Sequence, residues 1–184
     1  MVSTTTHPPL AVGRAALDQL RVVLEREVPA QAAGLLREIG FSAGASGYDG
    51  FVGSIVDRYG VKTPQALDAR YLGEALAGFF LEEGWGSVAV ETLAPGLFCL
   101  NSGDWAEAEP RGAGVPSCHF TCGLLSDFFT RLGGYPAAVM EVECRSRGEA
   151  RCRFLVGSPD LLIWMYEGMV TGKTYDALVG ELKK

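Results

Sequence analysis

Hydrophobic positions near the start of the chain follow the spacing of helices. Over residues 11–28, leucine and valine side chains recur three and four positions apart and the pattern stops before Pro29, which predicts one amphipathic helix. The same spacing over residues 33–39 predicts a second, shorter helix. The next stretch, residues 41–53, contains four glycines and is therefore expected to form a loop.

Helical spacing continues as far as residue 84. A weak helix is expected around residues 55–59, where apolar and polar positions alternate irregularly. Thr63-Pro64 joins a capping hydroxyl to a proline that suits the first turn, so we predict that another helix begins there. Its apolar face runs on to Gly84, where the helix should end.

The second half of the chain predicts two hairpins around one helix. Residues 86–93 and 97–100 form two strand patterns separated by a Pro-Gly turn. A polar loop over 101–116 leads into a helical stripe that ends at Gly133-Gly134. Residues 137–142 and 152–156 then predict a second hairpin, with a charged turn around Gly148.

These elements predict one α+β domain in which helices pack on an antiparallel sheet. Ser158-Pro159 begins a C-terminal helical segment, which Gly172 divides. We expect residues 1–10 to be a flexible tail and residues 11–184 to form the single domain. Within it, residues 11–84 should be helical and residues 85–184 should form the α+β part.

Composition and charge narrow the classes of partner. The chain has 184 residues and a formal net charge of −6, with an isoelectric point near 5.0. A surface that binds nucleic acid needs clustered lysine and arginine, so direct nucleic-acid binding is not expected. The apolar run over 161–166 is far too short to span a bilayer. The N-terminus has no pattern of a secretion signal, and we therefore expect a cytoplasmic protein.

The cysteines are the strongest chemical signal. Cys144 and Cys152 lie symmetrically about Gly148, so a three-residue loop over 147–149 would place them opposite one another on one face of the hairpin. Directly paired Cβ atoms lie about 4.5 to 5.5 Å apart, which suits two thiolates on one zinc ion and equally a cross-strand disulfide. A pair of reduced core cysteines is the third possibility.

Two further residues are candidates to complete a metal site. Cys118 and Glu141 would give a closed set of four ligands with the hairpin cysteines. Glu141 lies three positions before Cys144, so in a regular strand it would point to the opposite face. A bulge near 142–143 is needed to bring it to the metal. Cys122, one helical turn after Cys118, is the alternative fourth ligand.

This part of the chain resembles the 4-vinyl-reductase-type small-molecule-binding domain. The same domain is the sensor of bacterial activators that respond to xylene and phenol. The resemblance rests on the following residues: Val115-Pro116-Ser117-Cys118, Gly123, Phe128, Gly134, Val139-Met140-Glu141-Val142-Glu143-Cys144, Gly148 and Cys152-Arg153-Phe154.

The resemblance implies a fold, a metal site and a cavity. The fold is the ligand-binding fold shared with nitric-oxide signalling and Golgi-transport proteins. It also implies a homodimer, which we expect to form through the apolar N-terminal helices. The implied zinc ligands are Cys118, Glu141, Cys144 and Cys152. The residues expected to face an apolar cavity, because they lie on elements that flank it in the family, are Phe98, Leu100, Phe128 and Val139.

The sequence also departs from the aromatic sensors. Those activators carry an ATPase domain and a DNA-binding domain, for which this chain has no room, so we expect no direct transcriptional activation. Phenol-responsive members use a histidine and a tryptophan to bind the phenol hydroxyl. Here the histidines, His7 and His119, fall elsewhere, and Trp105 lies only near the expected position. Phenol itself is therefore not the expected ligand.

We favour a binding or sensing module for an apolar or aromatic ligand. The first alternative is an enzyme or accessory protein in tetrapyrrole 4-vinyl reduction, as the family's name suggests. A reductase needs a hydride donor, and the chain has no glycine-rich dinucleotide loop. Residues 168–174 do not qualify as a phosphate loop, because three residues rather than four separate the glycines. The second alternative is a scaffold protein.

Overall fold

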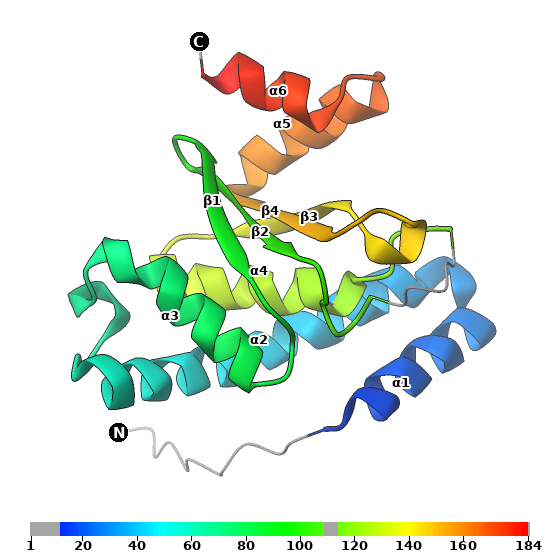
Figure 1. Cartoon of the computed structure of the whole chain (residues 1–184). Coiled ribbons are helices and arrows are strands. Elements are labelled where there is room, and N and C mark those ends of the chain that lie inside the picture. Colours follow the sequence, from blue (N-terminus) through cyan, green and yellow to red (C-terminus); the bar gives the residue numbers. More distant parts are fainter. Residues whose placement is uncertain (1–11, 109–113, 184) are drawn as a thin grey trace, which may run out of the picture.

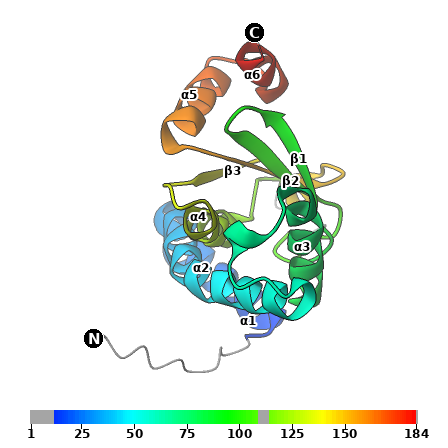
Figure 2. The ribbon, with the colours of Figure 1, turned by 90° about the vertical axis from the view of Figure 1, so that its left-hand side faces the viewer.

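The computed structural model describes residues 12–108 and 114–183. A four-stranded sheet lies between two unequal layers of helices (Figures 1 and 2). Helices α2, α3 and α4 lie on one face, with α1 packed against α2, and the C-terminal helices α5 and α6 cover part of the other. The predicted class, α+β with an antiparallel sheet packed against helices, is confirmed. The expected tail, residues 1–10, lies outside the described residues.

The N-terminal half differs from the prediction at its glycine-rich stretch. Helix α1 spans Arg14–Glu27, and α2 spans Pro29–Tyr59 as one continuous helix. The loop expected over residues 41–53 is therefore wrong. Gly44 packs against α4 (His119–Gly133) and does not form a turn. A Cβ atom added at Gly44 would lie only 2.6 Å from the Cβ of Asp127. Because Gly44 has no side chain, α2 and α4 can cross closely.

The same crossing uses two more glycines. A Cβ at Gly40 would collide with the carbonyl of Phe120, and one at Gly123 would collide with the carbonyl of Arg37. Glycine in a helix costs roughly 1 kcal/mol relative to alanine, and close packing of α2 on α4 offsets that cost here. The contact fixes where α4 lies under the sheet.

The helix predicted from Thr63 begins later. A short 3-10 turn, Pro64–Ala66, comes first, and α3 spans Ala69–Glu82. The Thr63 side chain makes no capping hydrogen bond, whereas the Asp68 carboxylate accepts one from the Arg70 backbone N–H. Asp68 is therefore the cap.

Both predicted hairpins are present in the sheet. Strands β1 (Ala89–Ala94) and β2 (Leu97–Ser102) form the first, and β3 (Ala138–Glu143) and β4 (Cys152–Gly157) the second. All neighbours are antiparallel and the order is β1-β2-β4-β3. Strand β4 is central and buried along its whole length. Strand β3 is thus at an edge, directly above α4.

The C-terminal segment forms the two short helices expected from its caps. Helix α5 spans Pro159–Val170 and α6 spans Tyr175–Leu182. The hydroxyls of Ser158 and Thr174 accept hydrogen bonds from the first turns of these helices. A separate apolar cluster joins both helices to the outer face of the sheet.

The main core lies between the sheet and helices α2, α3 and α4. It is rich in aromatic side chains, whose ring centroids lie 5.2–6.2 Å apart in edge-on and stacked pairs. The largest fully buried members are Trp105, Phe51, Phe80, Phe128 and Phe154. The centre of the domain is therefore filled by its own side chains.

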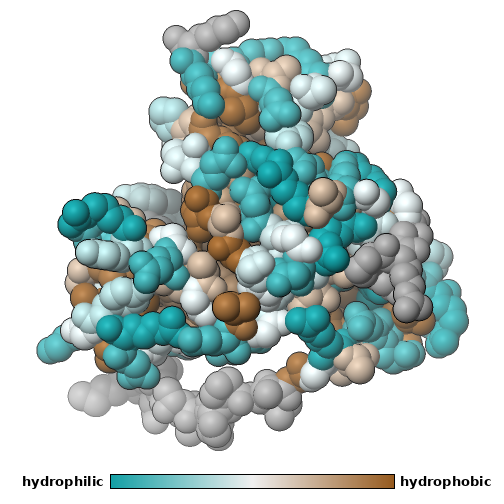
Figure 3. Space-filling model, viewed as in Figure 1, coloured by the Kyte–Doolittle hydropathy of each residue, from teal (hydrophilic) through white to brown (hydrophobic). Residues whose placement is uncertain are grey.

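The surface is mostly hydrophilic in the view of Figure 1, with apolar patches between the β1–β2 hairpin and α3 (Figure 3). Within the described ranges, no helix is long and apolar enough to cross a membrane. The cytoplasmic location expected from the sequence stays a prediction.

Candidate metal centre and adjacent cleft

Three cysteines and one glutamate meet at the turn end of the second hairpin. Cys118 lies just before α4, Glu141 lies in β3, Cys144 follows β3, and Cys152 begins β4. One ligand atom from each of the four lies within 4.8 Å of the others. The cysteines are fully buried and Glu141 is half-buried. The structure therefore brings together all four residues proposed as metal ligands.

A β-bulge explains how Glu141 reaches the cysteines. Glu141 pairs with Phe154 and Glu143 pairs with Arg153, so two steps along β3 match one step along β4. The extra residue, Val142, reverses the alternation of side chains after Glu141. The bulge that the sequence required near 142–143 is present.

The turn of the hairpin is longer than predicted. A 3-10 turn, Arg145–Arg147, follows Cys144, and Gly148 adopts a positive φ of 99°. The three-residue loop over 147–149 is therefore wrong. The turn is tied to the segment before α4 by a buried hydrogen bond of 2.6 Å between the Ser117 and Ser146 hydroxyls. This link holds Cys118 beside the hairpin.

The distance between two of these sulfurs suits a shared metal ion. The Sγ atoms of Cys118 and Cys152 lie 3.9 Å apart, while a disulfide bond is about 2.05 Å long. Bonds of about 2.3 Å to a tetrahedral zinc ion place two sulfurs about 3.8 Å apart. All five cysteines are free thiols.

Glu141 offers an oxygen to the same point. Its Oε2 atom accepts a hydrogen bond of 3.3 Å from the Cys118 backbone N–H. Its Oε1 atom is buried and has no hydrogen-bond partner among the described residues. A buried carboxylate oxygen without a partner is costly unless a cation or a proton satisfies it.

The cluster carries strongly shifted proton affinities. Burial raises the pKa of Glu141 to about 8. A hydrogen bond with Cys144 raises the pKa of the Cys118 thiol and lowers that of Cys144. For Cys152, the hydrogen bond with Cys118 lowers the pKa, but the bond with Cys144 and burial outweigh it, and the pKa is raised. Several acids buried together favour a cation among them.

The remaining two cysteines lie outside the group. Cys122 is buried one turn further along α4, and burial raises its pKa to about 12. Cys99 lies on β2, where its thiol hydrogen-bonds to the Glu91 carboxylate at 3.7 Å. Among the described residues the group contains Glu141 and not Cys122.

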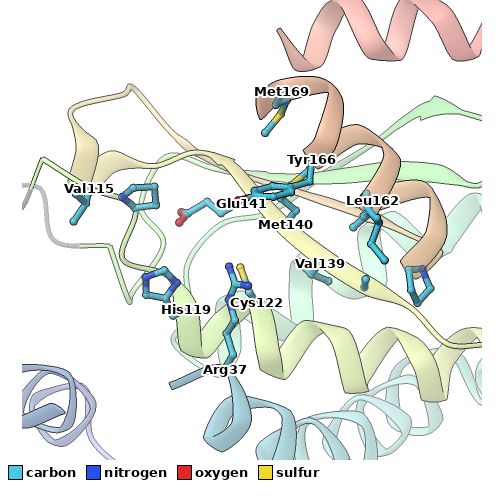
Figure 4. Close-up of a pocket in the computed structure, with 14 residues that line it drawn as sticks. Arg37, Val115, His119, Cys122, Val139, Met140, Glu141, Leu162, Tyr166 and Met169 are labelled. Atoms are coloured by element: carbon cyan, nitrogen blue, oxygen red, sulfur yellow. The ribbon is translucent and has the colours of Figure 1, made fainter. Parts of the chain in front are cut away.

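An open cleft lies beside the cluster. It has a volume of about 700 Å³ and runs along the edge of β3, between α4 and α5. Figure 4 shows Arg37, His119 and Cys122 on one side of β3, and Leu162, Tyr166 and Met169 on the other. Glu141 lines both the cleft and the cluster.

The comparisons with known proteins agree with this arrangement. Residues 106–158, which contain all four ligand candidates, match the family model of the 4-vinyl-reductase domain. Over this segment the chain is similar to the 4-vinyl-reductase domain. This confirms the resemblance inferred from the cysteine motif. No curated protein matches the sequence.

Solved structures extend the likeness beyond the matched segment. The phenol-responsive sensory domain of the transcription activator PoxR, solved with phenol, is 24% identical, with a TM-score of 0.60, and the match covers 82% of this chain and 76% of that one. Subunit 3 of a trafficking protein particle complex from Naegleria fowleri, covalently bound to palmitic acid, is 11% identical, with a TM-score of 0.56 and coverage of 78% and 89%. These two likenesses show the fold.

A further similar structure is a vinyl-4-reductase family protein from Methanocaldococcus jannaschii. It is 16% identical, with a TM-score of 0.49, and the match covers 81% of this chain and 83% of that one.

The four residues predicted to face one cavity belong to, or pack against, one hydrophobic cluster. Val139 lines the cleft beside the cluster. Phe98 lines a second pocket of about 540 Å³ between α3 and the sheet. Leu100 and Phe128 are 1% and 0% exposed and belong to the main core. Ligand binding by any of them stays a prediction.

Trp105 also lies in the core and not at a rim. It is 1% exposed, and its indole N–H donates a hydrogen bond of 2.7 Å to the Thr121 hydroxyl. Phe80 and Phe154 pack edge-on against it. This side chain helps fill the main core.

No sequence pattern predicts the positions of two residues at or near the site, Glu107 and Arg37. Glu107 is buried, and its carboxylate accepts hydrogen bonds from the backbone N–H groups of Phe120 (2.9 Å) and Thr121 (2.7 Å). It thereby caps α4 from a distance, which no local capping pattern indicates. Arg37 reaches the cleft from α2, and only the helix crossing places it there.

Proposed function

We propose that this 4-vinyl-reductase domain binds an apolar small molecule and that Cys118, Glu141, Cys144 and Cys152 hold a structural zinc ion beside the ligand. The observation that carries the proposal is the shared wall: the group of three cysteines and one glutamate borders an apolar cleft through Glu141. A rigid metal site would keep the edge of that cleft in one shape.

Zinc suits the ligand set. Three thiolates favour a soft or borderline ion, and a closed set of four protein ligands is typical of structural rather than catalytic zinc. Zinc would supply folding free energy, because it joins the segment before α4 to the β3–β4 hairpin. The buried, unpartnered Oε1 atom of Glu141 supports its place as fourth ligand.

The ligand would be held mainly by burial of its apolar surface. Pockets of a few hundred Å³ with apolar walls and few polar groups are typical of small-molecule sites. Two proteins of similar fold were solved with phenol and with palmitic acid, which supports an apolar occupant by analogy. The filled aromatic core leads us to place the ligand in the cleft beside β3 and not at the centre.

We also propose a homodimer. Helices α1 and α2 carry exposed apolar side chains, among them Val22 (45% exposed), Phe41 (49%) and Val56 (42%). A second copy would cover this surface by a symmetric contact.

Binding of a panel of apolar compounds to the zinc-loaded protein tests the proposal. Isothermal titration with naphthol, decanol, naphthoic acid and decanoic acid should detect at least one ligand, and Tyr166→Asp should weaken it. A panel that fails entirely would favour the scaffold role. Selective binding of a tetrapyrrole would favour the alternative in 4-vinyl reduction.

A further inference from the structure

The cleft beside the cluster of three cysteines and one glutamate has one charged end and one apolar end. Arg37 and His119 lie on the α4 side of β3, together with the Cys122 thiol (Figure 4). On the other side the walls are aliphatic or aromatic. The apolar residues that line the cleft between β3 and α5 include Met140, Leu162, Ile163, Tyr166 and Met169.

Arg37 is held in place at its base. Its backbone carbonyl lies where α2 meets Gly123 of α4, with no space for a Cβ between them. The side chain extends from this crossing toward Cys122 and β3 (Figure 4). The backbone of Arg37 is therefore held at a close helix contact.

Arg37 differs in its contacts from most other arginines of the described residues. Its guanidinium makes no ion pair or hydrogen bond with another residue in ranges 12–108 and 114–183. Most other arginines do pair with a carboxylate: Arg26, Arg58, Arg70, Arg131, Arg147, Arg151 and Arg153. An arginine that lines an apolar cleft without a carboxylate partner can bind one from a ligand.

The Glu141 carboxylate is not the partner of the Arg37 guanidinium. Glu141 is the acidic residue that lines the cleft, but its Oε2 atom accepts from the Cys118 N–H. Its Oε1 atom belongs to the metal group in the function proposed above. No contact within 4 Å joins it to Arg37.

We propose that the cleft binds apolar monocarboxylic acids, fatty or aryl, with the carboxylate on Arg37 and the apolar body along β3 and α5. This inference deepens the proposed function and rests on the cleft being the ligand site. Guanidinium and carboxylate match as a planar, two-point pair. The His119 ring lies on the same side of β3 and can donate a ring N–H to the same carboxylate. A neutral ligand of the same size would displace water from the Arg37 guanidinium without replacing the hydrogen bonds that the water made.

Matched pairs of probes test the charge requirement. Isothermal titration of the zinc-loaded protein would compare decanoic acid with decanol, and naphthoic acid with naphthol. The acid of at least one pair should bind about tenfold more tightly than its alcohol, because a charged pair near the surface contributes on that order. Raising the salt concentration should reduce this preference.

Variants at Arg37 separate its charge from its packing. Arg37→Met should lose about tenfold in affinity for the acid and leave the alcohol unchanged. Arg37→Glu should bind decylamine in preference to decanoic acid. Arg26→Met is the control, since Arg26 is exposed on α1 and pairs only with Glu27. At the apolar end, Tyr166→Asp should weaken every ligand, whereas Val170→Asp, also exposed on α5, should not.

The outcomes distinguish this inference from the proposed function. Equal affinity for acid and alcohol, or unchanged acid binding in Arg37→Met, would overturn the carboxylate preference and leave a ligand site of another selectivity. If no probe binds while zinc is retained, both the ligand site and its selectivity are wrong.

Discussion

Glu107 shows what a single buried carboxylate contributes. It is 3% exposed, and burial raises its pKa to about 7 in the folded chain. Its oxygens accept from two N–H groups at the start of α4. The same α4 terminus presents Cys118 to the metal group, so the proton state of Glu107 bears on the stability of the site.

Stability should therefore depend on pH through Glu107. Because the folded pKa lies above the unfolded value of 4.5, the folded chain holds the proton more tightly. This contribution is fully present below about pH 4.5 and is lost as the pH rises to about 7. It amounts to about 3 kcal/mol at most. Zinc binding carries a pH dependence of its own, so the slope should appear as the difference in free energy of unfolding by urea between the zinc-loaded wild type and Glu107→Gln.

Glu107→Gln provides the comparison for this pH dependence. The amide cannot ionise, so the slope between about pH 4.5 and 7 should flatten. One of its two terminal atoms is a donor, and the N–H facing it loses its acceptor, which should cost about 1–3 kcal/mol at low pH. An unchanged slope would assign the effect to another group.

At the residue scale the sequence predicted the metal group better than its surroundings. Cysteine spacing and the family motif identified all four residues of the cluster, and the position of Glu141 in the strand correctly predicted a bulge. Arg37 and Glu107 could not be predicted, because a helix crossing and a long loop place them. Neither leaves a periodic pattern in sequence.

Among the elements, α2 is the clearest case of tertiary packing overriding local propensity. Its glycine-rich stretch predicts a loop, because each glycine disfavours a helix by roughly 1 kcal/mol. Gly40 and Gly44 instead let α2 approach α4. Small residues spaced four positions apart are compatible with a loop and with a helix that packs closely. Only the presence of the partner helix, α4, decides between the two.

Alanine substitutions at two glycines should have opposite effects. Gly123→Ala places a Cβ against the Arg37 carbonyl, which must displace one helix and should cost about 3 kcal/mol or more, the upper range for overpacking. Gly53→Ala, within α2 with nothing within 4 Å of its Cβ, should stabilise by about 0.5–1 kcal/mol. Thermal unfolding of both variants measures the difference.

A loss of stability in Gly53→Ala equal to that in Gly123→Ala would contradict the continuous α2 and its contact with α4. Displacement of α4 should also move Arg37 relative to the cleft. Gly123→Ala should then bind the apolar acids less well, even at temperatures where it stays folded.

At the scale of the whole molecule, the order of the two hairpins and the terminal helices followed from turn and cap residues. Ser158 and Thr174 cap as expected, and the helical stripe under the sheet ends at Gly134. The location of the cavity did not follow. Whether side chains such as Phe128 fill the centre or line a space depends on packing volumes, which periodicity does not contain.

The proposed dimer should be visible in solution. Sedimentation of the zinc-loaded protein at tens of micromolar should give a mass near twice the 19.6 kDa of one chain. Phe41→Glu should shift it toward monomer, because a charge in an apolar contact remains unpaired. Val170→Glu, on the other helical layer, is the control. A monomer in the unmodified protein would exclude the dimer at this concentration.

Elemental analysis of the purified protein tests the central claim most directly. We expect about one zinc per chain, lost in Cys144→Ser, Cys152→Ser and Cys118→Ser and weakened in Glu141→Gln. Cys99→Ser and Cys122→Ser should retain it, because both lie outside the group. A wild-type protein without metal would contradict the account, and loss of zinc in Cys122→Ser with full retention in Glu141→Gln would contradict the place of Glu141.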